Sequence, residues 1–339
     1  MKIRFFAAVI CLCALLTGTM LMYMSMNKTD KATPKAVHES SDNDSSRNVF
    51  EEKTWQQDPL YDTSPISQAY LTGEEKGLDK EQKAVLEKAK QIISERITQD
   101  MTDYEKELMI HDYIVDNCAY DEEEIGVFQS HAEHSVDPYG ALVEGKAICS
   151  GYTTTFQMFM DMLEIECRSV YAKSSRDVDH AWNMVKLGGN WYHVDVTWDD
   201  PTPDQGKRPI RHKYFNVTDD YMEKKHVWDS TTTEEANSCE ESYIAHNLYK
   251  ISDFSEMTGY MEQALDSGNE NVYFDLDESL GADLSQVEDV DDRAVAELIS
   301  PQLQEIVEDH KNAHKDGYCY FQRIEYDGRI ILGCYMRLS

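Results

Sequence analysis

Three stretches of the chain decide its fold: GKAICSGY at residues 145–152, DHAWNMVK at 179–186 and WYHVDVTWDD at 191–200. The first predicts a helix that begins at Cys149. The other two predict a pair of strands, His180–Leu187 and Trp191–Trp198, joined by a tight turn within 188–190, where glycine is favoured. Cys149, His180 and Asp195 follow one another in an order that suits nucleophilic thiol catalysis.

The amino end of the predicted helix is a favourable place for a reactive thiol. Backbone N–H groups in the first turn of a helix have no partner within the helix, and the helix dipole is positive there. Both effects favour a thiolate at Cys149. Ser150 and Gly151 are small, and we expect them to let a substrate approach. A packed, buried thiol is the alternative, because cysteine is common in protein cores.

The register of the predicted hairpin decides whether His180 and Asp195 meet. With a two-residue loop at Gly188–Gly189, these residues are diagonal neighbours on one face of the hairpin. Diagonal positions lie about 7–8 Å apart, within reach of a His–carboxylate hydrogen bond. Asp195 would then orient the imidazole of His180 toward Cys149. A one-residue change in the loop would oppose the two residues directly or break the register, and the sequence leaves this open.

These motifs resemble the three blocks of the bacterial transglutaminase-like superfamily, which also includes kyphoscoliosis- and cytokinesis-type proteins. The lead-in to the cysteine, YGAL at 139–142 and GKA at 145–147, matches as well, and the similarity covers about residues 100–230. The resemblance implies an α+β, papain-like core in which the cysteine helix packs on an antiparallel sheet. It also implies that Cys149 is the nucleophile, His180 the general base and acid, and Asp195 the residue that orients His180.

The chemistry implied by the resemblance is acyl transfer through a thioester on Cys149. The acceptor would be water in a cysteine peptidase or amidase, and an amine in a protein-glutamine acyltransferase; the sequence leaves both open. The expected substrate is a protein or peptide, with cell-wall peptides as one class. The alternative is a non-catalytic binding or scaffold protein at the cell surface that retains the fold. We expect no cofactor and no metal, because the sequence has no compact His/Cys ligand spacing.

The amino-acid composition limits the classes of partner that we expect for this protein. The 339 residues include 64 Asp and Glu against 32 Lys and Arg, which gives a formal net charge of −32. Such a charge argues against nucleic acid, because phosphate binding needs a basic surface. The eight cysteines match no disulfide framework. The sequence does not indicate an oligomeric state.

The N-terminus predicts a targeting segment at residues 1–26. Lys2 and Arg4 precede an apolar run from Phe5 to about Met26, and roughly 20 apolar residues can span a bilayer. The flanking positive charges place the start of the chain in the cytoplasm and the rest outside it. We therefore expect a membrane-anchored extracytoplasmic protein. A cleaved signal, which would give a secreted protein, and a lipoprotein are the alternatives.

The remaining chain divides by composition into a polar, flexible tether at 27–60, a transglutaminase-like domain with N-terminal helices at 61–230, and a small α+β module of unknown role at 242–339. Helices are predicted within 79–99 and from a Thr102–Glu105 capping box onward. The elements predicted in the module are a strand at Val272–Leu276, a helix at Val295–His314, and a hairpin of Tyr318–Tyr326 and Arg329–Leu338 about Asp327–Gly328.

Overall fold

The computed structural model of this chain describes residues 60–121, 134–174, 178–200, 210–281, 284 and 318–337. The described residues belong to one compact unit. The predicted anchor at 1–26, nearly all of the tether at 27–60 and the predicted helix at Val295–His314 lie outside the described residues. Among the residues described, no helix is both long enough and apolar enough to cross a membrane.

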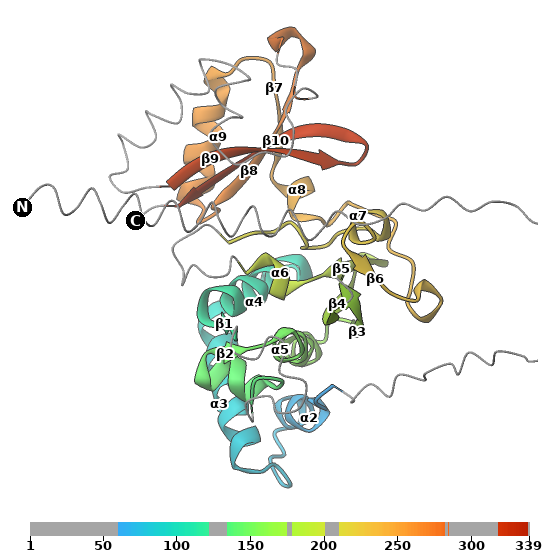
Figure 1. The fold of residues 1–339 in the computed structure, drawn as a ribbon. Helices are drawn as coiled ribbons and strands as arrows, with labels where there is room; N and C mark the ends of the chain where they lie inside the picture. The colour runs from blue at the N-terminus through green and yellow to red at the C-terminus, as the bar shows by residue number, and fades with distance from the viewer. Residues whose placement is uncertain are drawn as a thin grey trace, which may run out of the picture. The chain divides into compact units, whose positions relative to one another are not determined.

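Helices form the first part of the unit (Figure 1). They are α2 (Ser64–Thr72), α3 (Lys80–Arg96) and α4 (Asp103–Asn117). The capping box predicted at Thr102 is confirmed, since its side chain accepts from the Glu105 N–H while Glu105 bonds back to the Thr102 N–H. A π-helical turn, η2 (Gly140–Glu144), then leads into β2 (Lys146–Ala147), which pairs in parallel with β1 (Ala119–Tyr120).

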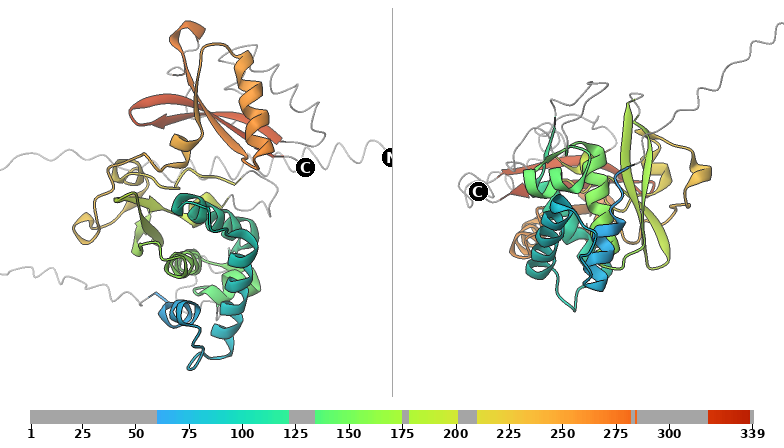
Figure 2. Two further views of the ribbon diagram at one scale, coloured as in Figure 1. Left: turned by 180° about the vertical axis from the view of Figure 1, so that it is seen from behind. Right: turned by 90° about the horizontal axis from the view of Figure 1, so that it is seen from below.

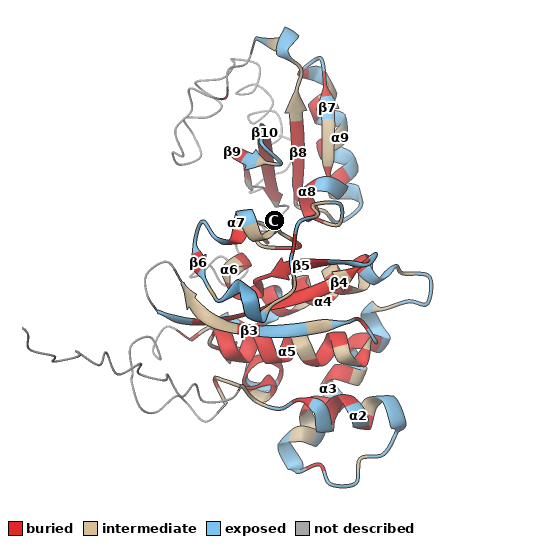
Figure 3. Cartoon of the chain, turned by 90° about the vertical axis from the view of Figure 1, so that its right-hand side faces the viewer, coloured by how far each residue is buried: buried red, intermediate tan, exposed pale blue. Residues whose placement is uncertain are grey.

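The central layer is a four-stranded sheet against which α5 (Cys149–Met162) packs. The strand order is β5 (Asn190–Val194), β4 (Asp179–Leu187), β3 (Cys167–Ser174) and β6 (His226–Val227), and all pairs are antiparallel. Two further views show α5 beside this sheet (Figure 2). Colouring by burial shows α5 and β4 almost wholly buried (Figure 3). The predicted core, a cysteine helix on an antiparallel sheet, is confirmed.

The hairpin of β4 and β5 has the loop that places His180 and Asp195 diagonally. Leu187 pairs with Asn190, so the loop is Gly188–Gly189, whose φ angles of 57° and 93° favour glycine. The second strand, however, ends at Val194, and the prediction that it continues to Trp198 is wrong. Asp195 accepts a hydrogen bond from the Trp198 N–H and caps a short helix, α6 (Val196–Asp199). Aspartate is a strong N-cap, and this local bond replaces further strand pairing.

The C-terminal part contains a second four-stranded sheet, in the order β7 (Leu248–Ile251), β8 (Asn271–Leu276), β10 (Arg329–Arg337) and β9 (Tyr318–Tyr326), with α9 (Ser255–Asp266) packed on β7 and β8. The predicted strand and hairpin are confirmed. Two short elements, η3 (Ser230–Thr232) and α8 (Tyr243–His246), lie between the last strand of the first sheet and the first strand of the second. Two others lie within a sheet's own chain segment: α7 (Asp219–Met222) precedes β6, and η4 (Glu278–Leu280) follows β8. The predicted domain boundaries stay predictions.

One carboxyl group in the helical layer is fully buried and has a single hydrogen-bond partner among the described residues. Glu107 of α4 is fully buried and accepts a hydrogen bond of 2.9 Å from Nδ2 of Asn216. Its second oxygen and the Asn216 carbonyl oxygen have no hydrogen-bond partner among the described residues. Burial, only partly offset by the Asn216 hydrogen bond and the nearby charge of His111, raises the pKa of Glu107 to about 8. The folded protein therefore keeps this group protonated at neutral pH.

We predict that Glu107→Gln removes part of the pH dependence of stability. The unfolded chain ionises Glu107 near its ordinary pKa, whereas the folded chain holds the proton until about pH 8. Wild-type stability therefore falls as pH rises across this window, by at most roughly 1.4 kcal/mol per pH unit. Glutamine cannot ionise, so its advantage over wild type should grow toward pH 8 in denaturant unfolding of the full chain. Exposed Glu95→Gln is the control; parallel pH profiles for Glu107→Gln and wild type would contradict the prediction.

Candidate active site

Cys149 is the first residue of α5, as predicted, and only 8% of its surface is exposed. The entry to the helix is fixed by a hydrogen bond of 2.8 Å from the Ile148 N–H to the Ser135 carbonyl. A Cβ added at Gly151 would lie 2.7 Å from both the Ala147 Cβ and the Ser135 carbonyl oxygen. Close packing at the helix start thus accounts for glycine at 151, a reason different from the substrate access that we expected.

His180 and Asp195 are brought together by the hairpin and the turn that follows it. Nε2 of His180, at the start of β4, lies 2.7 Å from Oδ2 of Asp195. Both residues are buried, and Asp195 has no exposed surface. The second ring nitrogen of His180 remains for the thiol of Cys149, which His180 contacts. All three predicted site residues therefore lie in one cluster.

Electrostatics favour the charged forms of the His180–Asp195 pair. Burial alone would lower the pKa of His180, but the charge of Asp195, the hydrogen bond to it and the contact with Cys149 raise the pKa. Burial alone would raise the pKa of Asp195, but His180 and a hydrogen bond from His226 lower it. An imidazolium held by a buried carboxylate is well suited to stabilise an adjacent thiolate.

Two residues that the sequence did not single out also border the cluster. Nε2 of His226, on β6, lies 2.9 Å from Oδ2 of Asp195, the same oxygen that His180 contacts. The Tyr120 phenol, on β1, lies beside the Cys149 backbone N–H. Both strands are only two residues long, so neither carries a periodicity that a sequence pattern could reveal.

Aromatic rings enclose the imidazole of His180. The ring centroid of Trp198 lies 5.6 Å away and that of Trp182 6.0 Å away. Trp182 is held by a hydrogen bond of 3.0 Å from its indole N–H to Nδ1 of His193. His193 in turn contacts Asp219 at 2.8 Å. These contacts limit water around His180 and fix the plane of the rings beside it.

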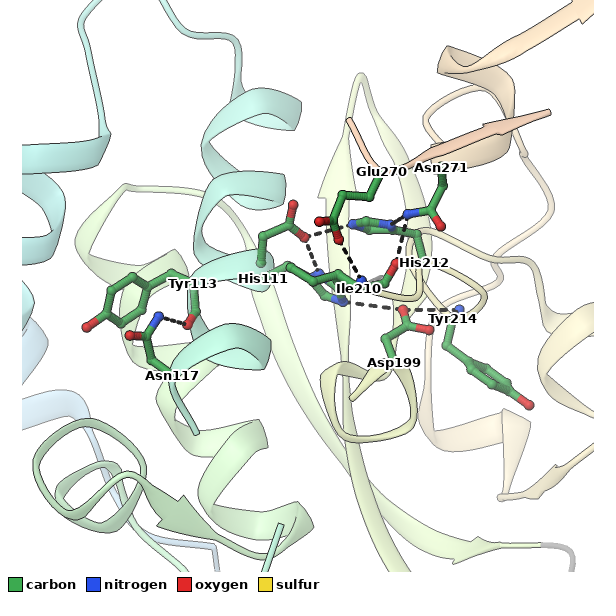
Figure 4. A network of polar contacts seen from close by, with 10 residues as sticks. His111, Tyr113, Asn117, Asp199, Ile210, His212, Tyr214, Glu270 and Asn271 are labelled. Carbon is green, nitrogen blue, oxygen red and sulfur yellow. Dashed lines mark hydrogen bonds and ion pairs between the residues drawn. The ribbon is translucent and has the colours of Figure 1, made fainter. Parts of the chain in front are cut away.

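A second polar network includes the buried residues His111, His212 and Asp199 (Figure 4). The two imidazoles are joined by Asp112, which is partly exposed. Oδ1 of Asp112 is 2.9 Å from Nδ1 of His111 and 2.7 Å from Nε2 of His212. Nε2 of His111 faces Asp199 at 3.3 Å, and Nδ1 of His212 is 3.0 Å from Nδ2 of Asn271. The network therefore joins α4, the end of α6 and β8.

Two groups within the described residues offer ligand types that a metal ion could use: His111, Asp112 and His212, and His180, Asp195 and His226. In each group one carboxylate oxygen already lies within hydrogen-bond distance of both imidazoles. The side chains thus satisfy one another, and the absence of a metal stays a prediction.

Comparison with known proteins supports the family resemblance. Residues 90–196 match the model of the transglutaminase-like superfamily. Kyphoscoliosis peptidase from Homo sapiens and its counterpart from Mus musculus are each 29% identical over 119 residues, which is 32% of this chain and 18% of the relative. A crystal structure of a TGase aligns with a TM-score of 0.30 and 19% identity, over 38% of this chain and 36% of that one.

The predicted resemblance is confirmed: this chain carries a transglutaminase-like domain. The chain spans less than a fifth of the length of the curated relatives that it matches.

We predict that Asp195→Asn slows alkylation of Cys149. The amide carries no charge to hold a proton on His180, so the thiolate loses its counter-ion. The rate with iodoacetamide at about pH 6.5 should fall at least roughly tenfold. Labelling must be mapped by peptide mass spectrometry, because Cys239 is also partly exposed. Asp219→Asn, which removes a carboxylate from another His–Asp pair, is the matched control. Equal rates in Asp195→Asn and wild type would refute this role.

Proposed function

We propose that the chain is a thiol acyl-transfer enzyme that acts on protein or peptide amides. The observation that supports this most directly is the contact of His180 with both Asp195 and Cys149, in which one ring nitrogen serves the carboxylate and the other is left for the thiol. This arrangement meets the requirement for an activated nucleophile with an oriented base.

The proposed reaction has two steps, formation of a thioester on Cys149 and its breakdown. The Cys149 thiolate adds to the amide carbonyl, and His180 gives its proton to the nitrogen as the C–N bond breaks, which leaves a thioester and a free amine. Water or a second amine then attacks the thioester and loses a proton to His180. The C–S bond breaks, and the thiolate and imidazolium are restored.

The developing oxyanion needs hydrogen-bond donors near Cys149. Its own backbone N–H, in the first turn of α5, is one candidate donor. The hydroxyl of Tyr120 lies beside that N–H and is a second candidate. Burial, together with the nearby negative charges of Cys149 and Asp195, raises the pKa of Tyr120, so the hydroxyl keeps its proton and can donate it in a hydrogen bond.

We propose that the reaction takes place outside the cytoplasm. The support is the apolar run after Lys2 and Arg4, which has the length and flanking charge of a membrane anchor. Protein or cell-wall peptides at the cell surface would then be the accessible substrates. The name of the curated relatives, kyphoscoliosis peptidase, favours testing hydrolysis before amine transfer.

We predict that Cys149→Ala abolishes acyl transfer. Loss of a catalytic nucleophile typically lowers turnover by more than about 1000-fold. The full chain should be incubated with casein, with and without a fluorescent primary amine. Release of peptides, release of ammonia and incorporation of the amine are then measured together, which separates hydrolysis from transfer. Cys239→Ala, which removes a thiol distant in sequence from the motif, is the control.

The same experiment contains the outcome that would overturn the proposal. Turnover that persists unchanged in Cys149→Ala would show that the thiol is not the nucleophile. Binding of the protein substrate that is equal in wild type and variant, without any turnover, would favour the scaffold function instead.

A further inference from the structure

We propose that His226 is a positioning residue for this reaction, which donates a hydrogen bond to Asp195 and keeps that carboxylate ionised and aimed at His180. The inference rests on the proposed function. It also goes beyond the family comparison, because the matched region ends at residue 196.

The first support is the way in which the Asp195 carboxylate is held. Its Oδ2 lies 2.7 Å from Nε2 of His180 and 2.9 Å from Nε2 of His226, and its Oδ1 accepts a hydrogen bond of 3.1 Å from the Trp198 N–H. Both oxygens are therefore engaged, and the carboxylate cannot rotate without breaking a contact. Losing His226 would leave Oδ2 with a single donor and free it to turn away from His180.

The second support is the tautomer that the surroundings impose on His226. Its Nδ1 is buried and has no hydrogen-bond partner among the residues that the structure describes. A proton on Nδ1 would thus be an unpaired buried N–H, whereas a proton on Nε2 has the Asp195 carboxylate as acceptor. The surroundings therefore favour a proton on Nε2, which His226 donates to the Asp195 carboxylate.

The third support is that the ring of His226 is fixed. Its backbone pairs with Ser174 at the edge of the sheet. Its ring centroid lies 4.4 Å from that of Trp198, 5.0 Å from that of Trp182 and 5.5 Å from that of Tyr214. Contacts on several sides hold Nε2 at Asp195, as a positioning residue requires.

Among the residues that the structure describes, the titratable groups that face the His180–Asp195 pair come from several elements. Cys149 comes from α5, Tyr120 from β1 and Tyr214 from the segment before α7. Burial raises the pKa of both tyrosines, so they stay neutral in the range where the pair works. The hydrogen bond from His226 is among the causes that lower the pKa of Asp195. Removing this hydrogen bond should raise the pKa of Asp195. On acidification, the His180–Asp195 ion pair would then be lost at a higher pH than in wild type.

The test compares the pH profile of Cys149 alkylation by iodoacetamide in the full chain. His226→Phe keeps a buried aromatic ring but has no donor. We expect a rate roughly tenfold lower at neutral pH and an acid limb moved to higher pH. His226→Gln can place an amide N–H near the Nε2 position, and we expect a rate within about twofold of wild type with an unmoved limb. His212→Gln, which alters a buried imidazole paired with Asp112, is the matched control and should leave the limb unmoved.

Two results would overturn the inference. One is a wild-type rate and pH profile in His226→Phe, and the other is a change in His226→Phe no larger than that in His212→Gln. If His226→Phe does not fold, the tautomer of His226 in the wild-type protein tests the inference instead. This tautomer is measured by ¹⁵N NMR of histidine-labelled protein. A proton on Nε2 of His226 supports the inference, and a proton on Nδ1 overturns it. Failure of the proposed function is distinct, because Cys149 would then react at the same rate in wild type and His180→Gln.

Discussion

The buried carboxylate of Asp195 is the constraint on which the rest of this site depends. A charge without any exposed surface costs several kcal/mol unless it is paired and hydrogen-bonded. Three groups satisfy it: the imidazoles of His180 and His226 and the backbone N–H of Trp198. Each comes from a different element, so the charge is stable only when β4, β6 and α6 are all in place.

Pairs of an imidazole and a carboxylate recur around the site. His193 contacts Asp219, and Asp112 lies between His111 and His212, so buried imidazoles are repeatedly matched by carboxylates that are themselves partly exposed. These pairs join segments far apart in the chain; His212 and Asp112, for example, are 100 residues apart. Paired in this way, buried charges specify one arrangement of the elements, because removing one partner leaves the other uncompensated. Asn271 on β8 extends one of these networks into the C-terminal sheet.

Local signals in the sequence predicted the parts of the fold that local interactions determine. The start of α5 at Cys149, the Thr102 capping box and the Gly188–Gly189 loop all depend on residues within a few positions of one another. The end of β5 was predicted wrongly because two local preferences competed at Asp195. The alternating pattern favoured a continued strand, whereas the aspartate side chain capped the next helix.

The parts of the site that the sequence did not predict depend on tertiary pairing. His226 reaches Asp195 only because a two-residue strand is added at the sheet edge, next to β3. Tyr120 reaches Cys149 because β1 pairs in parallel with β2. Neither strand is long enough to show an alternating pattern. Both residues also lie far in sequence from the site residues beside which they are placed, Asp195 for His226 and Cys149 for Tyr120.

The protonation state of His180 tests most directly whether the buried carboxylate of Asp195 holds an imidazolium beside Cys149. In ¹⁵N NMR of the histidine-labelled full chain, with the signal assigned by its loss in His180→Gln, we expect protons on both ring nitrogens of His180 at neutral pH. In Asp195→Asn we expect a neutral His180 ring under the same conditions. A neutral His180 in wild type, or the same protonation in both proteins, would contradict a buried carboxylate that holds an imidazolium beside Cys149.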